Sequence, residues 1–394
     1  MDKIVNVLIT GMFMVLFNPF IAQVSKVEVR KENKTAYGLY KNNKPYYIKG
    51  AGAKSHFGLL AQSGANSIRL WSTNNEAFLD SAQHYDMTVC LGLYVRPERT
   101  GMDYNDDYAV KGQIEQLKTE ILKYKDHPSL LIWGIGNEVD LRYSNFKVWE
   151  TIEELAQFIK KVDPNHPTMF INRANWNEFY EFTDQVEPML LDFYHYHWDG
   201  RRHPERRYIY LSSFRELGIK NGIPIMRCVG GNVPINQLRQ TIYTSLAYGI
   251  KGFHFWPPWM FSINKENDKP ILKDGKIVPR INVPSLAKVA KEIKPLGPTL
   301  VKLTSTAVYH TTPVHPNAPG AAPFPKDHWL QLSGEQMLAG FFKGKDNLKY
   351  FMIVNCDHTQ ARSTNITMNG KIKTVQKLSK QNGEWKNITL KDSK

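Results

Sequence analysis

Short apolar runs and longer amphipathic segments alternate along most of this chain. Each run is followed by a few polar residues and then by a segment with helical spacing of its apolar positions. The runs are apolar throughout, as expected of parallel strands that are buried on both faces. The predicted strands are Tyr47–Gly52, Ala65–Trp71, Thr88–Val95, Leu130–Val139, Pro167–Asn172, Leu190–His195, Ile223–Val229 and Gly252–Trp256. The predicted helices are Asn75–Tyr85, Val110–Tyr124, Asn145–Val162, Pro204–Lys220, Ile235–Tyr248 and Ser285–Ile293.

This order of elements predicts an α/β fold, and in particular a TIM (β/α)8 barrel. Eight strands that alternate with helices over about 250 residues are typical of that barrel. An open, doubly wound sheet is the alternative, but no glycine-rich phosphate loop follows the first strand. After residue 300 the pattern changes to short alternating segments separated by turns such as Asn369-Gly370, which predicts a small antiparallel β-sandwich.

The N-terminal residues predict a signal peptide and then a hairpin. Lys3, the apolar run from Ile4 to Phe17 and the small Ala22 are typical of a secretory signal, and the run is too short to anchor the chain stably in a membrane. The resulting domains are residues 1–22 (signal peptide), 23–45 (β-hairpin), 46–300 (barrel) and 301–394 (sandwich). We therefore expect a secreted or periplasmic protein after cleavage of the signal peptide.

Charge and composition indicate an anionic partner. The net charge is +14, and residues 301–394 contain 13 Lys and Arg against 6 Asp and Glu. This balance favours an acidic polysaccharide or a cell envelope over a nucleic acid, since no nucleic-acid-binding motif accompanies it. The 3 cysteines are widely spaced and fit no zinc pattern, so we interpret them as buried thiols and expect neither metal nor cofactor.

The candidate chemistry centres on Leu130–Val139, whose sequence is LLIWGIGNEV. This apolar strand ends in glycines and then presents Asn137 and Glu138, an arrangement that suits a catalytic carboxylic acid. Partial burial would raise the pKa of Glu138. The alternative is a core strand followed by a helix that Asn137 caps. In TIM barrels the reactive groups stand at the C-terminal ends of the strands. The polar and aromatic residues at those predicted ends are Arg69, Trp71, Asn137, Glu138, His195, Tyr196, Asp199, Arg227 and Trp256.

Several of these segments resemble the clan A glycoside hydrolases, which are retaining β-glycosidases on a TIM barrel, and especially the β-galactosidase and β-glucuronidase-like enzymes. The resemblance rests on WGIGNE, YYIKGAG, NSIRLW, the DPNHP run and the aromatic eighth strand. It implies that Glu138 is the acid/base and that Asn137 holds the sugar 2-hydroxyl. It also implies that Arg69 supports the nucleophile, that Tyr196 lines the site and that Trp256 forms its floor.

The sequence departs from this family on the seventh strand. Val229 stands where the family has a nucleophilic glutamate, and no Asp or Glu occurs between Leu217 and Asn264. A retaining mechanism needs two carboxyl groups about 5 Å apart, whereas an inverting one tolerates about 6.5–9.5 Å. The candidates for the second group are Asp199, His195, Cys228 and Glu98.

Arg227 and the histidine pair each allow two interpretations. Arg227 either faces the cleft, where it would suit a substrate carboxylate, or lies in the helix layer. His195 and His197 share a strand face and favour hydrogen bonding over metal binding, because no third ligand is evident.

The sequence thus predicts a secreted glycoside hydrolase-like protein that acts on an anionic poly- or oligosaccharide. In this hypothesis Glu138 is the general acid/base, and the second catalytic group is atypical. The alternatives are a non-catalytic carbohydrate-binding homologue and a scaffold that binds a partner.

Overall fold

The computed structural model describes most of the chain from residue 23 onwards. The described ranges are 23–33, 36–74, 76–139, 141–172, 193–197, 207–230, 233–256, 272–277, 283–314, 321–346, 348–369, 372 and 374–389. Of residues 31–33, 36, 172, 193–197, 272, 276–277 and 283–284 the structure describes the backbone alone. The predicted signal peptide, Asp199 and the loops that follow the sixth and eighth strands lie outside these ranges. No described helix is both long and apolar enough to cross a membrane.

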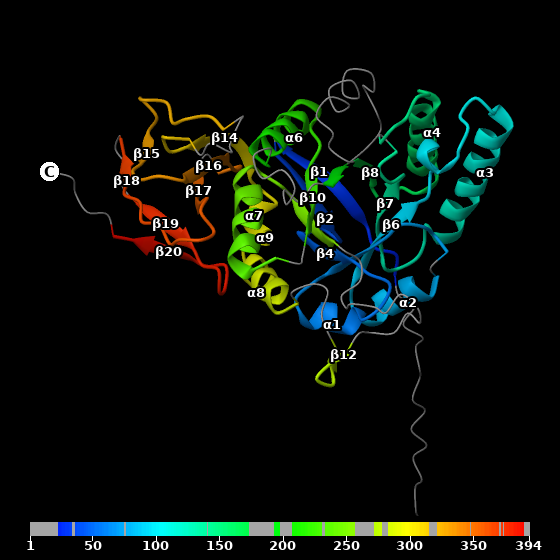
Figure 1. Cartoon of the computed structure of the whole chain (residues 1–394), viewed down its shortest axis with the longest axis horizontal. Coiled ribbons are helices and arrows are strands. Elements are labelled where there is room, and N and C mark those ends of the chain that lie inside the picture. Colours follow the sequence, from blue (N-terminus) through cyan, green and yellow to red (C-terminus); the bar gives the residue numbers. More distant parts are fainter. Residues whose placement is uncertain are drawn as a thin grey trace, which may run out of the picture.

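Eight parallel strands close into a barrel in the order β10-β11-β4-β5-β6-β7-β8-β9, so the predicted TIM barrel is confirmed. Its strands are β4 (Ile48–Gly52), β5 (Ser67–Leu70), β6 (Thr88–Leu93), β7 (Leu130–Ile135), β8 (Thr168–Asn172), β9 (Phe193–His197), β10 (Ile225–Gly230) and β11 (Gly252–Trp256). The described helices are α1 (Phe57–Gln62), α2 (Glu76–His84), α3 (Asp107–Tyr124), α4 (Lys147–Val162), α6 (Arg207–Asn221), α7 (Ile235–Ala247), α8 (Val283–Ile293) and α9 (Gly297–Leu300), with the 3-10 turn η1 (Glu98–Thr100). Figure 1 shows the helices arranged around the strands.

A three-stranded antiparallel sheet closes the N-terminal end of the barrel, where a two-stranded hairpin was predicted. It consists of β1 (Val27–Asn33), β2 (Ala36–Lys41) and β3 (Lys44–Pro45). Asn42 and Asn43 join β2 to β3 with positive φ angles of 49° and 65°, the backbone of a tight hairpin turn. Val27 and Leu39 pack in one cluster with barrel residues such as Ile48, so ligands must approach from the opposite end.

The C-terminal region consists of small antiparallel sheets and lies beside the barrel. The strands are β14 (Thr304–His310), β15 (Leu330–Leu332), β16 (Met337–Lys343), β17 (Lys349–Asn355), β18 (Ile366–Met368), β19 (Val375–Leu378) and β20 (Trp385–Ile388). They pair as β14-β16-β17, β15-β18 and β19-β20, while a separate short hairpin joins β12 (Leu272–Lys273) to β13 (Lys276–Ile277). The antiparallel region is therefore present; its closure into a sandwich and the domain boundaries stay predictions.

Helix α7 joins the two regions, because it packs on the barrel and on β16 and β17 (Figure 1). Gln240 donates a hydrogen bond to the backbone oxygen of Cys356, and a Cβ added at Gly340 would lie 2.1 Å from the oxygen of Ala247. Next to this contact, the buried Lys251 Nζ donates to the backbone oxygens of Leu300, Val301 and Leu303, the first at 2.7 Å. The barrel and the C-terminal sheets are thus packed tightly against each other.

Candidate active site

Glu138 follows β7 at the C-terminal end of the barrel strands and has an unusual backbone conformation. Its φ angle is 51°, and that of Gly136 is 72°. A left-handed conformation costs a non-glycine residue about 1–2 kcal/mol, so neighbouring contacts must maintain it. The Glu138 backbone N–H donates to the Ile171 oxygen on β8 at 2.8 Å, and the Glu138 oxygen accepts from Leu141 at 3.2 Å. These two hydrogen bonds fix the backbone of Glu138, from which its partly exposed side chain extends.

Asn137 is held by Arg69 on β5, and the hypothesis that it caps a helix is wrong. The Arg69 guanidinium donates to Asn137 Oδ1, whereas the next helix, α4, begins at Lys147. Arg69 is 2% exposed. Its burial lowers its pKa to about 10, although the nearby Cys228, Glu138 and Cys90 act in the opposite direction. Arg69 and Glu138 therefore lie close enough for their charges to interact.

Two tryptophans extend this group of residues across the barrel end. The Arg69 guanidinium lies over the Trp71 ring, 5.0 Å from its centroid. Trp71 contacts Trp256 of β11 edge to face, with centroids 5.3 Å apart. Trp256 is 39% exposed, so an indole remains accessible to a ligand. Strands β5, β7 and β11 thus bring together five predicted site residues: Arg69, Trp71, Asn137, Glu138 and Trp256.

Arg99, which sequence reasoning missed, stabilises the backbone beneath the carboxylate. This exposed residue of η1 donates to the Glu138 oxygen and, at 3.0 Å, to the Asn137 oxygen. Its neighbour Glu98 accepts hydrogen bonds from the backbone and hydroxyl of Ser144, the latter at 2.8 Å. Glu98 therefore connects two loops at this end of the barrel, which makes it a poor candidate for the second catalytic group.

If the barrel is a glycosidase that uses Glu138, the Arg99→Gln variant should have a kcat about tenfold lower with little change in KM. A small displacement of a catalytic group reduces turnover, whereas substrate contacts made elsewhere are unaffected. Steady-state kinetics measure this effect, and Arg99→Lys should restore part of it because one ammonium can reach one of the two carbonyls. Lys111→Gln on the exposed face of α3 is the control. Equal kcat in all four proteins would show that Arg99 has no positioning role.

The seventh strand has a different orientation from the one that the family resemblance implies. The Arg227 guanidinium is fully buried and donates to the Ser245 hydroxyl and, at 3.4 Å, to the Thr241 oxygen, both on α7. The hypothesis that Arg227 faces the cleft is therefore wrong, since its side chain lies in the helix layer. Residues two apart on a strand share a face, so Val229 points to the same layer. Cys228, which influences the pKa of Arg69, lies on the inner face.

The sixth-strand candidates can be placed by backbone register alone. His195 is paired with Ile171 and Met226, and Tyr196 with Arg227. Their side chains, and Asp199 as a whole, lie outside what the structure describes. Within the described part of the chain, no group of three or more His, Cys, Asp or Glu is arranged to hold a metal ion. All 3 cysteines are buried free thiols, as predicted.

The fold and the described site define a TIM barrel with an amide and a carboxylic acid at the C-terminal end of β7. Residues 54–238 match the family model of the glycosyl hydrolases family 2, TIM barrel domain. This match supports a glycosidase-like function for the barrel.

Solved structures with the same fold include two β-glucuronidases and a β-galacturonidase. The enzyme of Bifidobacterium dentium, complexed with coumarin-3-O-glucuronide, has a TM-score of 0.51 at 16% identity, covering 68% of this chain and 49% of that one. The family 2 β-galacturonidase of Eisenbergiella tayi, bound to galacturonate, has a TM-score of 0.50 at 18% identity over 68% and 54%. The β-glucuronidase of Ruminococcus gnavus, in complex with a C6-substituted uronic isofagomine, has 0.50 at 13% over 68% and 52%. The chain thus spans about half the length of these structures.

Proposed function

We propose that the barrel hydrolyses glycosidic bonds of an acidic oligo- or polysaccharide outside the cytoplasm, with Glu138 as general acid. One observation carries this proposal: Glu138 is held in a left-handed conformation beside the Arg69–Asn137 bond, at the end of the barrel where such enzymes act. A strained residue held by its surroundings is typical of a catalytic position.

The surroundings of Glu138 suit protonation of a leaving group. A general acid must come within hydrogen-bond reach of the leaving oxygen, and the partly exposed Glu138 lies beside the groups that could hold the sugar. The accessible indole of Trp256 can stack on a sugar ring, and Asn137 offers an amide for a sugar hydroxyl. Arg69 fixes the orientation of that amide, because its guanidinium donates to the amide oxygen and leaves the amide NH2 free to point elsewhere.

An acidic substrate is supported by charge and by the structural neighbours. The chain carries a net charge of +14, which attracts polyanions. Glucuronide and galacturonate are the ligands named for two of the similar structures. A uronic acid is therefore the first substrate class to test, and the predicted signal peptide would deliver the protein to where such polysaccharides occur.

A non-catalytic carbohydrate-binding role is the second candidate. It is favoured by the orientation of β10, where Val229 replaces the family's glutamate and points to the helix layer. Such a protein would keep the aromatic and amide contacts but would not cleave the bond, because hydrolysis also needs a base or nucleophile.

Incubation with matched acidic and neutral glycans separates the two candidates. We expect the purified protein to release reducing ends from uronic-acid-containing oligosaccharides and not from neutral ones of equal length. Variants Asp199→Asn, His195→Gln and Cys228→Ser, assayed in parallel, would identify the second group by loss of turnover. If the unaltered protein binds acidic glycans but releases no product from any glycan, the non-catalytic role is favoured.

A further inference from the structure

A large cavity lies in the C-terminal region, away from the residues that surround Glu138. It measures about 850 Å3 and is lined mainly by β17, β18 and the β19–β20 hairpin. A smaller cavity of about 340 Å3 continues from it along α7, and the two share Tyr243, Ile353 and Lys380. We call the two together the C-terminal groove. Each of the two cavities falls within the range of about 300–1,000 Å3 that is usual for small-molecule sites.

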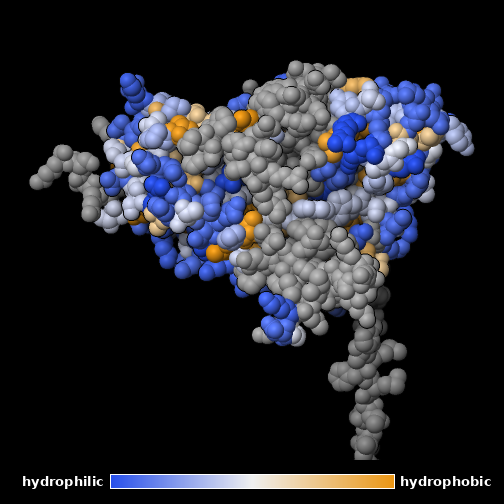
Figure 2. Space-filling model, viewed as in Figure 1, coloured by the Kyte–Doolittle hydropathy of each residue, from blue (hydrophilic) through white to orange (hydrophobic). Residues whose placement is uncertain are grey.

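Aromatic side chains line the larger cavity without filling it. Trp385 is 41% exposed, and its ring contacts that of Tyr350 at 5.8 Å between centroids. An accessible indole beside polar side chains such as Thr367 and Gln376 is suited to stacking on a sugar ring. Figure 2 shows that hydrophilic residues predominate on the visible face of this region, with small hydrophobic patches among them.

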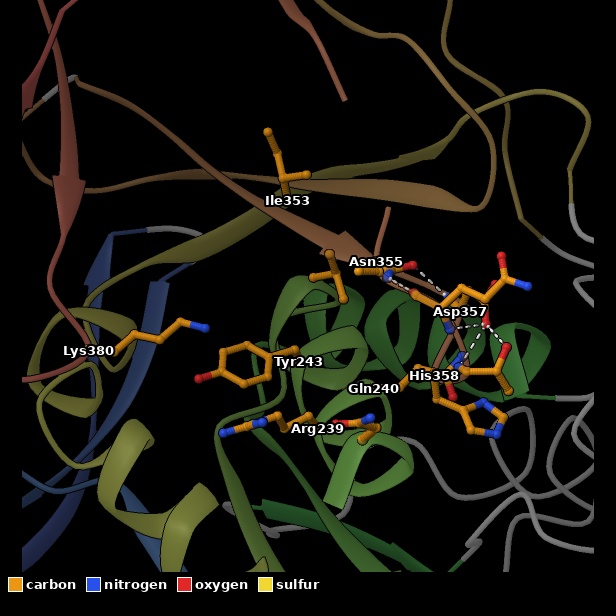
Figure 3. Close-up of a pocket in the computed structure, with 13 residues that line it drawn as sticks. Arg239, Gln240, Tyr243, Ile353, Asn355, Asp357, His358 and Lys380 are labelled. Carbon is orange, nitrogen blue, oxygen red and sulfur yellow. Dashed lines mark hydrogen bonds between the residues drawn. The ribbon is translucent and has the colours of Figure 1, made fainter. Parts of the chain in front are cut away.

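Three lysines line the groove and give it a positive charge. The Lys380 ammonium lies over the Tyr243 ring at 4.1 Å, and the Lys349 ammonium lies over the Trp329 ring at 4.7 Å. Figure 3 shows the Lys380 side chain extended towards Tyr243, with Arg239 below. These aromatic contacts hold each ammonium in place without neutralising it. Among the described residues, neither these two lysines nor Lys377 takes part in an ion pair.

Two acidic residues close to the groove are paired with arginines, whereas Asp346 accepts a hydrogen bond from the Tyr350 hydroxyl and forms no ion pair with a described residue. Glu292 forms an ion pair with Arg239, and Asp357 forms one with Arg362 at 2.7 Å. Partial burial lowers the pKa of Lys380, and the positive charges of Arg239 and Lys377 add to this effect against the opposing influence of Glu292. A bound anion would relieve that repulsion, so the groove is complementary to negative charge.

We propose that the C-terminal groove binds a short acidic oligosaccharide, with Trp385 stacking on a sugar ring and Lys377 and Lys380 contacting its carboxylates. This site would be separate from the residues around Glu138 and would work whether or not the barrel is catalytic. It would hold one part of a polyanionic chain while another part occupies the barrel.

Calorimetric titration of the Glu138→Gln protein, which removes turnover as a complication, tests the proposal. The probes are an oligogalacturonate, a neutral oligosaccharide of equal length and an oligoglutamate peptide. We expect the oligogalacturonate to bind with an affinity that falls as salt rises. In the Trp385→Ala and Lys380→Met variants, the affinity at one class of sites should fall about fivefold or more. Lys326→Met, an exposed lysine outside the groove, is the control.

Three results would overturn the proposal. They are equal binding of the neutral oligosaccharide, unchanged binding in both groove variants, and peptide binding as tight as that of the saccharide, which would reassign the groove to an acidic peptide. Thermal unfolding of each variant shows whether the hairpin remains folded. Hydrolysis of a uronic-acid disaccharide by the protein with Glu138 intact reports on the barrel alone, because this substrate is too short to reach both sites. Failure of this proposal is therefore distinguishable from failure of the proposed hydrolysis.

Discussion

Replacing Glu138 with glutamine is expected to lower kcat for an acidic glycoside by at least about 100-fold, the usual contribution of a general acid. Glutamine has nearly the same shape, so the bonds to the Ile171 oxygen and from Arg99 persist and the backbone is undisturbed. It cannot supply a proton to the leaving oxygen. Steady-state kinetics with an oligosaccharide measure the loss, and calorimetry checks that binding persists.

The leaving group provides an internal test of this role. When an aryl glycoside carries an acidic phenol, the phenolate departs without protonation. Glu138→Gln should therefore lose much less activity on that substrate. Glu150→Gln, on the exposed side of α4, is the control for removing a carboxylate. An equal loss on both substrates would mean that Glu138 does not protonate the leaving group, and no loss on either would exclude it from the reaction.

Introducing glutamate at position 229 is expected to destabilise the protein without creating the missing nucleophile. Val229 is 1% exposed and shares its strand face with Arg227, which contacts α7. A carboxylate there would be buried among apolar side chains rather than opposite Glu138. Burying a poorly paired charge costs at least about 3 kcal/mol of unfolding free energy. Denaturant unfolding measures this cost, and kinetics should show no gain in turnover.

A matched control separates burial from the effect of a new charge. Leu122 on α3 is 50% exposed, so Leu122→Glu should change the unfolding free energy by no more than about 0.5 kcal/mol. If Val229→Glu instead folds normally and increases hydrolysis, then position 229 faces the cleft, and the second catalytic group has been lost from its usual place.

The barrel could be predicted from the sequence because eight apolar strands and their helices each carry a strong local signal. The inward or outward direction of each side chain could not be predicted in the same way. β10 is buried on both faces, so its sequence IMRCVG contains no alternation that separates Arg227 from Cys228. β14, which was not predicted, has a mixed burial pattern and precedes a proline-rich loop that obscures it.

The site was predictable where side chains carry the function and less so where the backbone is the partner. Glu138 and Asn137 stand out because an amide and an acid follow an apolar strand. Arg99 binds two backbone oxygens, and no pattern of side chains in the sequence marks such a contact. Asn137 was ambiguous for a related reason, because its partner Arg69 is 68 residues away along the chain.

The close approach of Gly340 to Ala247 affects how this architecture can be rearranged in evolution. Any side chain at position 340 would collide with the backbone of α7, and Gln240 of the same helix bonds to Cys356 beyond it. One helix thus completes the outer layer of the barrel and the floor of the C-terminal sheets. The barrel and the C-terminal sheets are separate segments of the sequence, but both pack against α7. Exchange of the C-terminal region between relatives would therefore require matching changes in α7, so the two should be inherited as a pair.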